Sequence, residues 1–289
     1  MGKIYKTLIF DGQISLSVLD TTDVVNEAIR LHKLTPVCAA ALGRTLTVTA
    51  FMASQLKGKD ERLSVTINGN GAGGKIIAAA DSKLNVRGAI DNPTVDLPLK
   101  ANGKLDVGGV VGNSGYITVV KNLGLKEPYV GRSELVSGEI GEDFAAYYAY
   151  SEQQPTAIAV GALIKNEKCI GAGGVIIQPL PDCTEENLVK AENLVNKFSD
   201  VSKQISETGV EGIIEKYFKG YDFNAFDVRY KCNCSDEYVR KVLITLGEKE
   251  LYDAIEKDGK IEVCCQFCDK KYVYYKKDVD EFLGKQNDG

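Results

Sequence analysis

The spacing of cysteines near the C-terminal end constrains the fold of this chain more than any other feature. Five of its eight cysteines lie in the last 58 residues, as Cys232-Asn233-Cys234 and Cys264-Cys265-Gln266-Phe267-Cys268. Four thiolates complete a tetrahedral shell around one soft divalent ion, and zinc is the usual occupant of such a shell. A stretch of about 60 residues cannot easily bury a self-sufficient core, so a metal would hold it folded. The pattern therefore predicts a zinc-binding module at this end.

The expected ligands are two cysteines from each group: Cys232 and Cys234 from the first, and Cys265 and Cys268 from the second. Cys264 is an alternative to Cys265 as a ligand. The two-residue interval between Cys265 and Cys268 makes the tighter turn, so we place Cys264 outside the shell. Whether Cys264 can replace Cys265 stays open. From spacing alone an inert structural clamp is the default interpretation. Cysteines so close together can also oxidise to a local disulfide, so a redox sensor is a second interpretation.

The other cysteines and the single histidine suggest no separate site. Cys38 falls in an apolar helical stretch and is expected in the core, whereas Cys169 and Cys183 have no partner motif and are interpreted as ordinary thiols. His32 would have to carry any Ser-His-Asp or Cys-His catalysis alone, and no site can be assembled around it. We therefore expect His32 to be structural.

Two further patterns have a non-catalytic explanation. Residues 69–74 match G-x-G-x-x-G, but that motif requires a following helix to bind a pyrophosphate, and residues 75–80 resemble a strand. A glycine-rich hairpin is the better interpretation. Glu139, Glu142 and Asp143 begin a predicted helix and are expected to serve its dipole and a solvated face.

Composition and charge limit the class of protein. The net charge is −5 and the pI about 5.2, which argues against nucleic-acid binding. The segment 231–289 carries 11 Lys+Arg and 13 Asp+Glu, a net charge of −2, although zinc modules that grip phosphates are usually basic. No run approaches the roughly 20 apolar residues of a membrane helix, and the N-terminus has no signal-peptide pattern. We therefore expect a cytoplasmic protein with no membrane partner.

The chain is expected to be α+β, with three parts. Residues 1–180 predict β-sheets around a buried helix, because the stretch from Val37 to about Leu56 is apolar on nearly every side. Residues 181–230 predict a charged helical linker, in which Thr184 caps an amphipathic helix of about six turns. That helix either packs permanently on a neighbour or exposes its apolar stripe conditionally, and the pattern alone favours permanent packing. Residues 231–289 form the predicted zinc-binding domain.

The cysteine pattern resembles the zinc-centre signature of the heat-shock protein 33 family, the redox-regulated holdase chaperones of bacteria. The resemblance extends over nearly the whole chain. The segments that carry it, besides the cysteine pairs, are Thr35-Pro36-Val37-Cys38-Ala39-Ala40-Ala41-Leu42-Gly43-Arg44, Asp91-Asn92-Pro93, Gly103-Lys104-Leu105-Asp106-Val107-Gly108-Gly109, Glu127-Pro128-Tyr129-Val130-Gly131 and Leu135-Val136-Ser137-Gly138-Glu139-Ile140. Cys264, the additional thiol beside the second pair, is a departure.

The resemblance implies a chaperone that is not an enzyme and needs no ATP. The family is inactive when reduced, with one Zn²⁺ per chain, and active after oxidation. By resemblance the disulfides are Cys232–Cys234 and Cys265–Cys268, the active form is a homodimer, and the partners are unfolded client proteins. Zinc thiolates are the form that oxidants attack, and loss of the metal removes the free energy that holds the module folded.

Two other classes of function remain as alternatives. A static zinc protein that recruits a partner would bind with its metal in place and gain nothing on oxidation. A thiol oxidoreductase using Cys265-Gln266-Phe267-Cys268 would need an exposed thiol of low pKa near a thioredoxin-like βαβ pattern, which this sequence lacks.

Overall fold

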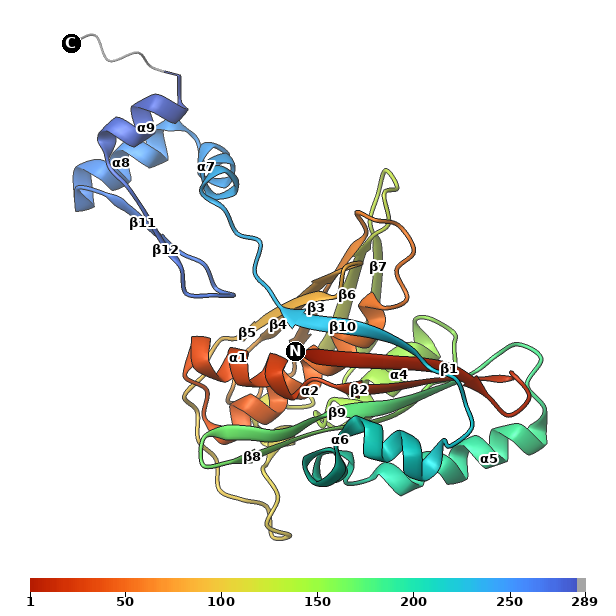
Figure 1. The fold of residues 1–289 in the computed structure, drawn as a ribbon. Helices are drawn as coiled ribbons and strands as arrows, with labels where there is room; N and C mark the ends of the chain where they lie inside the picture. The colour runs from red at the N-terminus through yellow and green to blue at the C-terminus, as the bar shows by residue number, and fades with distance from the viewer. Residues whose placement is uncertain (285–289) are drawn as a thin grey trace. The chain divides into compact units, whose positions relative to one another are not determined.

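The structure is a computed structural model that describes residues 1–284 (Figure 1). The chain divides into two compact units, Met1–Lys231 and Cys232–Gly289. Helices and strands both contribute to each unit, so the predicted α+β class is confirmed. The last five residues of the predicted zinc-binding domain, 285–289, lie outside the described residues.

The first unit contains the long strands and most of the helices. Its strands are β1 (Gly2–Ile9), β2 (Ile14–Asp20), β3 (Arg62–Asn68), β4 (Ile76–Asp81), β5 (Asn85–Ile90), β6 (Tyr116–Asn122), β7 (Tyr129–Glu134), β8 (Ala157–Lys165), β9 (Lys168–Pro179) and β10 (Asn224–Tyr230). Its helices are α1 (Thr22–His32), α2 (Pro36–Ala53), α3 (Val107–Val111), α4 (Gly141–Tyr150), α5 (Glu185–Val195), the 3₁₀ turn η1 (Asn196–Phe198) and α6 (Val201–Tyr217).

The ten strands of this unit form one sheet, in the order β7-β6-β3-β4-β5-β10-β1-β2-β9-β8. The pairing is antiparallel throughout except between β10 and β5, which run parallel. The strands β3 to β7 form one half of the sheet, and β1, β2, β8 and β9 form the other. Among the described strands, only the late strand β10 pairs with both halves (Figure 1).

Helix α2 is the centre of the first core, as predicted from its composition. It packs against strands of both halves of the sheet, including β4, β5, β8 and β9. Pro36 occupies its first turn, where its missing N–H costs nothing, and the threonine hydroxyls inside it bond back to carbonyls four residues earlier. By length and composition α2 would also be able to cross a membrane, but 89% of that window is buried inside the fold. Its apolar character is therefore explained by the core that surrounds it.

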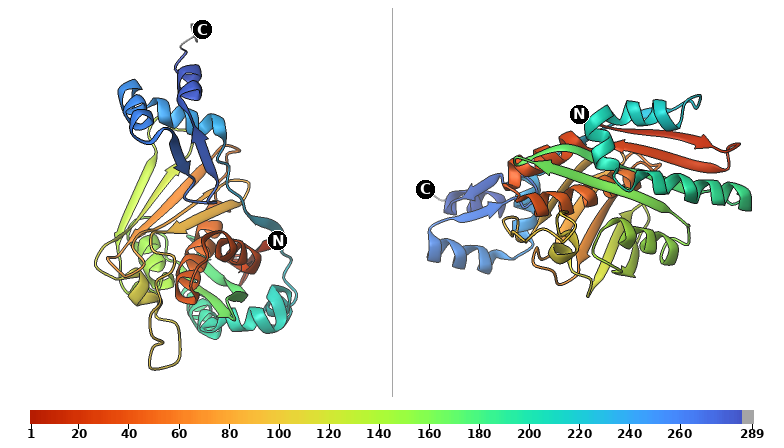
Figure 2. Two further views of the ribbon diagram at one scale, coloured as in Figure 1. Left: turned by 90° about the vertical axis from the view of Figure 1, so that its left-hand side faces the viewer. Right: turned by 90° about the horizontal axis from the view of Figure 1, so that it is seen from below.

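A second core lies between the sheet and the two helices of the linker. Figures 1 and 2 show α5 and α6 along the side of the sheet formed by β2, β8 and β9. The fully or nearly buried side chains of this second core are Ile9, Ile14, Leu16, Val18, Val175, Ile177, Ala191, Leu194, Phe198, Val201, Ile205, Val210, Ile213 and Phe218. The amphipathic stripe of the linker is therefore covered by the sheet in this structure, which agrees with the packed interpretation.

The linker differs from the prediction in two details. The Thr184 hydroxyl accepts a hydrogen bond from the Asn187 N–H at 3.4 Å, so the predicted cap is present. The predicted six-turn helix is broken, because η1 and a short turn separate α5 from α6. The non-helical dihedrals of Gly209 inside α6 lie beyond that predicted helix. The end of the segment is also not helical, since residues 224–230 form β10.

Asp143 corrects the predicted role of the acidic residues at 139–143. Its side chain is fully buried and accepts hydrogen bonds from the backbone N–H groups of Val136, Ser137, Gly138 and Ile140, at 2.8–3.1 Å. The helix begins at Gly141, whereas the sequence predicts a start at Gly138 with Ser137 as its cap. One carboxylate therefore organises the turn before α4, whereas a solvated face was expected.

Glu139 is also engaged inside the protein. It forms an ion pair with Arg44 of α2 at 2.8 Å and another with Lys100. Burial raises the pKa of the Glu139 carboxyl, but the hydrogen bonds from Lys100 and Arg44 outweigh burial and lower it. Of the three acidic residues, only Glu142 is exposed as predicted.

The second unit is small. Its elements are α7 (Asp236–Ile244), α8 (Glu248–Asp258), β11 (Ile261–Cys264), β12 (Lys271–Tyr274) and α9 (Lys276–Phe282). Strands β11 and β12 form an antiparallel hairpin. Its buried apolar core consists of Val239, Leu243, Leu251, Ile255, Tyr272, Tyr274 and Val279.

Candidate metal centre

The second unit brings the four predicted ligands together from two loops. Cys232 and Cys234 follow directly after β10, and the next residue, Ser235, caps α7 by accepting a hydrogen bond from the Tyr238 N–H at 3.1 Å. Cys265 and Cys268 occupy the turn that follows β11. Each pair is therefore fixed by the element next to it.

The four sulfur atoms are spaced for one ion. The Sγ atoms of Cys232 and Cys265 are 3.6 Å apart, those of Cys234 and Cys268 are 3.4 Å apart, and all four lie within 4.8 Å of one another. Sulfurs at the corners of a tetrahedron, each ~2.3 Å from a central zinc ion, would be roughly 3.8 Å apart. The set of donors is four thiols, which is the composition of a structural zinc site.

A tight turn presents the second pair of sulfurs. The Cys265 N–H donates to the Lys270 carbonyl at 2.9 Å, and the Cys268 and Asp269 N–H groups both donate to the Cys265 carbonyl. Asp269 adopts a positive φ of 56°, a conformation that Asp tolerates better than most residues. The two intervening residues thus place both sulfurs on one side of the turn.

The electrostatics of the four thiols depend on their shared burial. Burial raises the pKa of Cys232 well above its ordinary value and raises the pKa of Cys268 to about 11. Burial also acts to raise the pKa of Cys234, but hydrogen bonds from the Tyr272 hydroxyl and from the neighbouring thiols outweigh it, so this pKa is lowered. Without a cation the cluster cannot hold four negative charges, whereas a bound Zn²⁺ would deprotonate a coordinating thiol.

Tyr272 is a site residue that the sequence analysis did not identify. It lies on β12, its ring belongs to the core of the unit, and its hydroxyl donates to Cys234 Sγ at 3.1 Å. A hydrogen bond to a thiolate ligand fixes the orientation of that ligand and stabilises its charge. The alternation of Tyr272, Val273 and Tyr274 along a strand indicated that one aromatic face is buried, but not that it reaches the sulfurs.

The remaining cysteines stay outside the cluster. Cys264 is exposed at the end of β11, opposite Lys271, and it is not among the four clustered sulfurs. Cys38 and Cys169 are buried in the first core, and burial raises the pKa of Cys169 to about 12, as expected of inert thiols. Cys183 is half-buried at the start of the linker. All eight cysteines are free thiols.

The other sequence patterns carry no active site. The glycine-rich segment 69–74 leads into β4, not into a helix, which supports its rejection as a nucleotide motif. His32 ends α1, and its Nε2 lies 3.1 Å from the Tyr230 hydroxyl at the end of β10. His32 therefore has a structural partner close to the cysteine unit in sequence.

Comparisons with known proteins agree over almost the entire chain. A family model described as "Hsp33 protein" matches residues 2–275. The protein named "33 kDa chaperonin" of Clostridioides difficile strain 630 is 43% identical over 277 residues, which cover 94% of this chain and 95% of that protein. The protein of the same name of Staphylococcus haemolyticus strain JCSC1435 is 42% identical over 291 residues, with 98% of each covered.

A solved structure is similar over the same length. The crystal structure of the 33 kDa chaperonin (heat shock protein 33 homolog) from Thermotoga maritima matches with a TM-score of 0.88 at 35% sequence identity. The match covers 98% of this chain and 97% of that one.

Proposed function

The chain belongs to the Hsp33 family of chaperones, and from this premise we propose that it is a redox-regulated holdase that works without ATP. Membership of a chaperone family confirms the prediction that the chain is not an enzyme, and it implies binding of unfolded proteins. The proposal adds the switch: the reduced, zinc-bound form is inactive, and oxidation of the cysteine cluster activates it.

The observation that carries the proposal is the four-sulfur cluster inside a unit with little else to stabilise it. Four sulfurs within 4.8 Å fit one Zn²⁺, held by Cys232, Cys234, Cys265 and Cys268. When bound, the ion would supply structural free energy, on the order of 10–16 kcal/mol in zinc-finger peptides. A core of seven side chains would not replace that contribution. Losing the metal is therefore expected to unfold the unit.

Oxidation would remove the ligands in a balanced two-electron step at each pair. Two thiolates transfer two electrons to one peroxide, two protons are taken up, and the products are one disulfide and two waters. Two such steps consume two peroxides and four protons, and they leave no thiolate to hold the released Zn²⁺. We propose Cys232–Cys234 and Cys265–Cys268 as the two disulfides.

This pairing has a consequence that the alternative pairing lacks. The short sulfur contacts, Cys232 with Cys265 and Cys234 with Cys268, join the two loops of the cluster. Disulfides across these contacts would staple the loops together. Disulfides within each pair would leave the loops unconnected, which is the arrangement that allows the unit to unfold. Peptide mapping of the oxidised protein distinguishes the two pairings.

Unfolding of the cysteine unit would then reach the linker through the chain itself. Cys232 follows the end of β10 after a single residue, and β10 follows α6 after a short connection. Once β10 loses its folded anchor, α5 and α6 would separate from the sheet. Their apolar stripe and the sheet residues of the second core would become available to clients. We also propose that the active form is a homodimer and that the protein acts in the cytoplasm.

The test compares zinc release with chaperone activity in the same sample. Peroxide with mild heat should release about one zinc per chain, and light scattering from a thermally unfolded client should fall without ATP. A Cys264→Ser variant should behave like the original protein, because this exposed thiol lies outside the cluster. Zinc loss with unchanged scattering would contradict the proposal, and binding of partners only with zinc in place would favour the static zinc protein instead.

A further inference from the structure

Strand β10 occupies a position in the sheet that an incoming polypeptide could take. It is the last strand of the first unit in sequence, yet it lies in the middle of the sheet between β5 and β1. Without β10 the sheet would divide into a five-stranded half ending at β5 and a four-stranded half ending at β1. We call the space between these two edges, Gly2–Lys6 of β1 and Asn85–Val86 of β5, the β10 slot.

The main chain of β10 is bonded on both sides. It pairs antiparallel with β1, from Gly2 opposite Val228 to Lys6 opposite Asn224. On the other side the Arg229 N–H donates to the Leu84 carbonyl at 3.1 Å, and the Lys231 N–H donates to the Val86 carbonyl at 2.9 Å. Loss of β10 would leave unpaired donors and acceptors on two strands, and such edges bind extended chains through their backbones.

Two side chains of β10, two positions apart, enter the first core. Val228 is fully buried among the residues around α2, and Tyr230 packs against the same core. The Tyr230 hydroxyl donates to the Gly88 carbonyl at 2.9 Å and accepts from the Gly88 N–H at 3.4 Å. It thereby satisfies backbone groups of β5 beyond the point where β10 leaves the sheet. His32 Nε2 of α1 lies 3.1 Å from the same hydroxyl oxygen.

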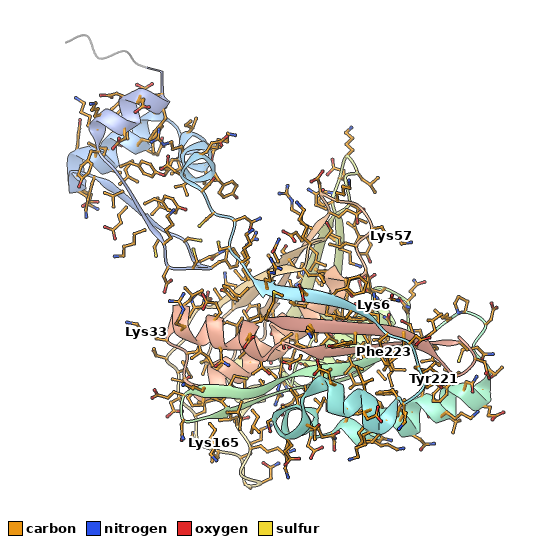
Figure 3. The ribbon with its side chains drawn as sticks, viewed as in Figure 1. Lys6, Lys33, Lys57, Lys165, Tyr221 and Phe223 are labelled. Carbon is orange, nitrogen blue, oxygen red and sulfur yellow. The ribbon has the colours of Figure 1, made fainter. Side chains whose placement is uncertain are left out.

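The side chains in the first half of β10 are not buried in a core. Residues 224–227 are exposed, and Phe226, the largest of their side chains, is 46% exposed. Before the strand, Phe223 packs edge-on against Tyr5 and Phe218, in the connection that Figure 3 labels at Tyr221 and Phe223. After the strand the chain enters the cysteine unit. Both ends of β10 are thus attached to segments that the proposed oxidation releases.

The slot should keep its width when β10 leaves. Helix α1 packs against β1, β5 and β9, and α2 packs against strands of both halves of the sheet. These helices hold β1 and β5 two strand spacings apart, about 9.6 Å, which is the room that one strand needs.

We propose that the β10 slot of the oxidised protein captures an extended segment of an unfolded client as a replacement strand, a proposal that rests on the redox-switched chaperone function. The client strand runs antiparallel to β1 and parallel to β5. It places two apolar side chains, two positions apart, where Val228 and Tyr230 now lie. Lys3 faces Asp227 across the present pair, so an acidic residue before the first apolar one is favoured. Main-chain bonding accepts many sequences, as a chaperone requires.

The test uses a fluorescein-labelled peptide with the sequence of residues 224–230 and the full-length protein. Fluorescence anisotropy should show saturable binding to the oxidised, zinc-free protein and at least tenfold weaker binding to the reduced, zinc-bound protein. A matched pair of peptides tests main-chain recognition. N-methylation at Arg229 removes the donor to β5 and should weaken binding at least tenfold. N-methylation at Asp227 is the control. The Asp227 N–H also points toward β5, but it lies before the first residue of β10 that pairs with β5, which is Arg229.

Hydrogen exchange on the same samples shows where the peptide binds. Gly2–Lys6 and the β5 segment should be protected in the reduced protein, exchange after oxidation, and regain protection when the peptide is added. An unlabelled client that suppresses light scattering should displace the peptide.

Three results would overturn the proposal. The first is no saturable binding to oxidised protein up to millimolar peptide, and the second is equal binding of the two N-methylated peptides. The third is protection of both edges after oxidation in the absence of peptide. Protection that does not depend on protein concentration would mean that the two halves of the sheet have closed on each other. Protection that increases with protein concentration would mean that a second copy of the chain fills the slot. Any of these in a sample that still suppresses client aggregation rejects the slot and leaves the chaperone function standing. Failure of aggregation suppression itself rejects the proposed function.

Discussion

The two compact units of this chain are held together by different means. The first unit has a large core around α2 and a second core under the linker helices, and its sheet joins ten strands. The second unit has a core of seven buried apolar side chains, two short strands and a cluster of four thiols. Burial of apolar side chains stabilises the first unit, whereas the proposed zinc ion would supply much of the stability of the second. An event that removes the metal can therefore unfold one part of the molecule and leave the scaffold of the other intact.

The difference also indicates where the proposed switch would act. The linker helices and β10 belong to the first unit by packing, but the chain continues from β10 directly into the cysteine unit. Because they lie next to the small unit along the chain, they are the part of the large unit that unfolding of the small unit would affect first. Local stability in proteins is not uniform, and elements with few buried contacts open first. β10, with one fully buried side chain, fits this description.

The largest expected effect is on the metal. Cys268→Ser removes one of four thiolate ligands, so we expect loss of stable zinc binding and unfolding of the second unit, while the first keeps its cooperative thermal transition. Metal analysis and hydrogen exchange check both parts. Cys264→Ser is the matched control, one exposed thiol in the same loop region, and should retain zinc. Full protection of the second unit without zinc would show that its core is sufficient by itself.

The second core gives the next largest effect. Phe198 is nearly fully buried and packs against Tyr217 and Phe218, with ring centroids 5.0 and 5.9 Å away. Phe198→Ala should destabilise the packing of the linker by about 3–5 kcal/mol. We expect client binding to begin in the reduced, zinc-bound protein, measured by light scattering. Val189→Ala, on the exposed side of α5, should change neither stability nor activity. If the reduced Phe198→Ala protein has a destabilised linker but does not suppress client aggregation, release of the linker is not sufficient for activation.

The first core depends on a buried carboxylate as well as on apolar side chains. Asp143→Ala leaves four backbone N–H groups before α4 without their acceptor, and we expect a loss of about 2 kcal/mol or more in the free energy of unfolding. Denaturant unfolding of the first unit measures it. The neighbouring exposed Glu142→Ala should cost far less, and equal losses for the two variants would refute the capping role.

The smallest expected effect concerns the hydrogen bond to a ligand. Tyr272→Phe keeps the ring in the core but removes the donor to Cys234 Sγ. Zinc affinity should fall roughly tenfold, as for other partners of metal ligands, and a chelator should remove the ion faster. Tyr238→Phe, which alters an exposed tyrosine of the same unit, serves as the control. Unchanged zinc affinity would mean that the four sulfurs are positioned by the backbone alone.

Much of the fold could be predicted because it depends on local patterns. The apolar composition of α2, the cap at Thr184 and the stripe of α5 and α6 all act within a few turns of chain. Helix α3 and strand β7 could not be predicted because glycines weaken their patterns. Strand β10 was not predicted either, because its alternating Phe226, Val228 and Tyr230 stand within a charged segment. The placement of β10 in the sheet depends on pairing with residues more than 140 positions away, which no local pattern reveals.

The site shows the same limit. The spacing of the cysteines predicts which thiols meet, because a Cys-x-x-Cys turn presents both sulfurs from one loop. Tyr272 could not be assigned, since its contact with Cys234 spans 38 residues and depends on how β12 packs. Asp143 lies in the first turn of α4, as a helix-dipole residue should, but it is buried and binds the turn before the helix, where a solvated side chain was expected. The Tyr272 contact is long-range, whereas the partners of Asp143 lie only three to seven residues earlier and were missed because the pattern does not show that this carboxylate is buried.

Hydrogen exchange across the whole chain, before and after peroxide, shows whether unfolding of the second unit releases the linker from the first. We expect release of about one zinc to be accompanied by loss of protection in residues 232–284 and in the linker with β10, residues 185–230, while α2 keeps its protection. Loss of zinc and of protection in 232–284, with 185–230 still protected, would contradict this expectation, because the small unit would then unfold without releasing anything from the large one.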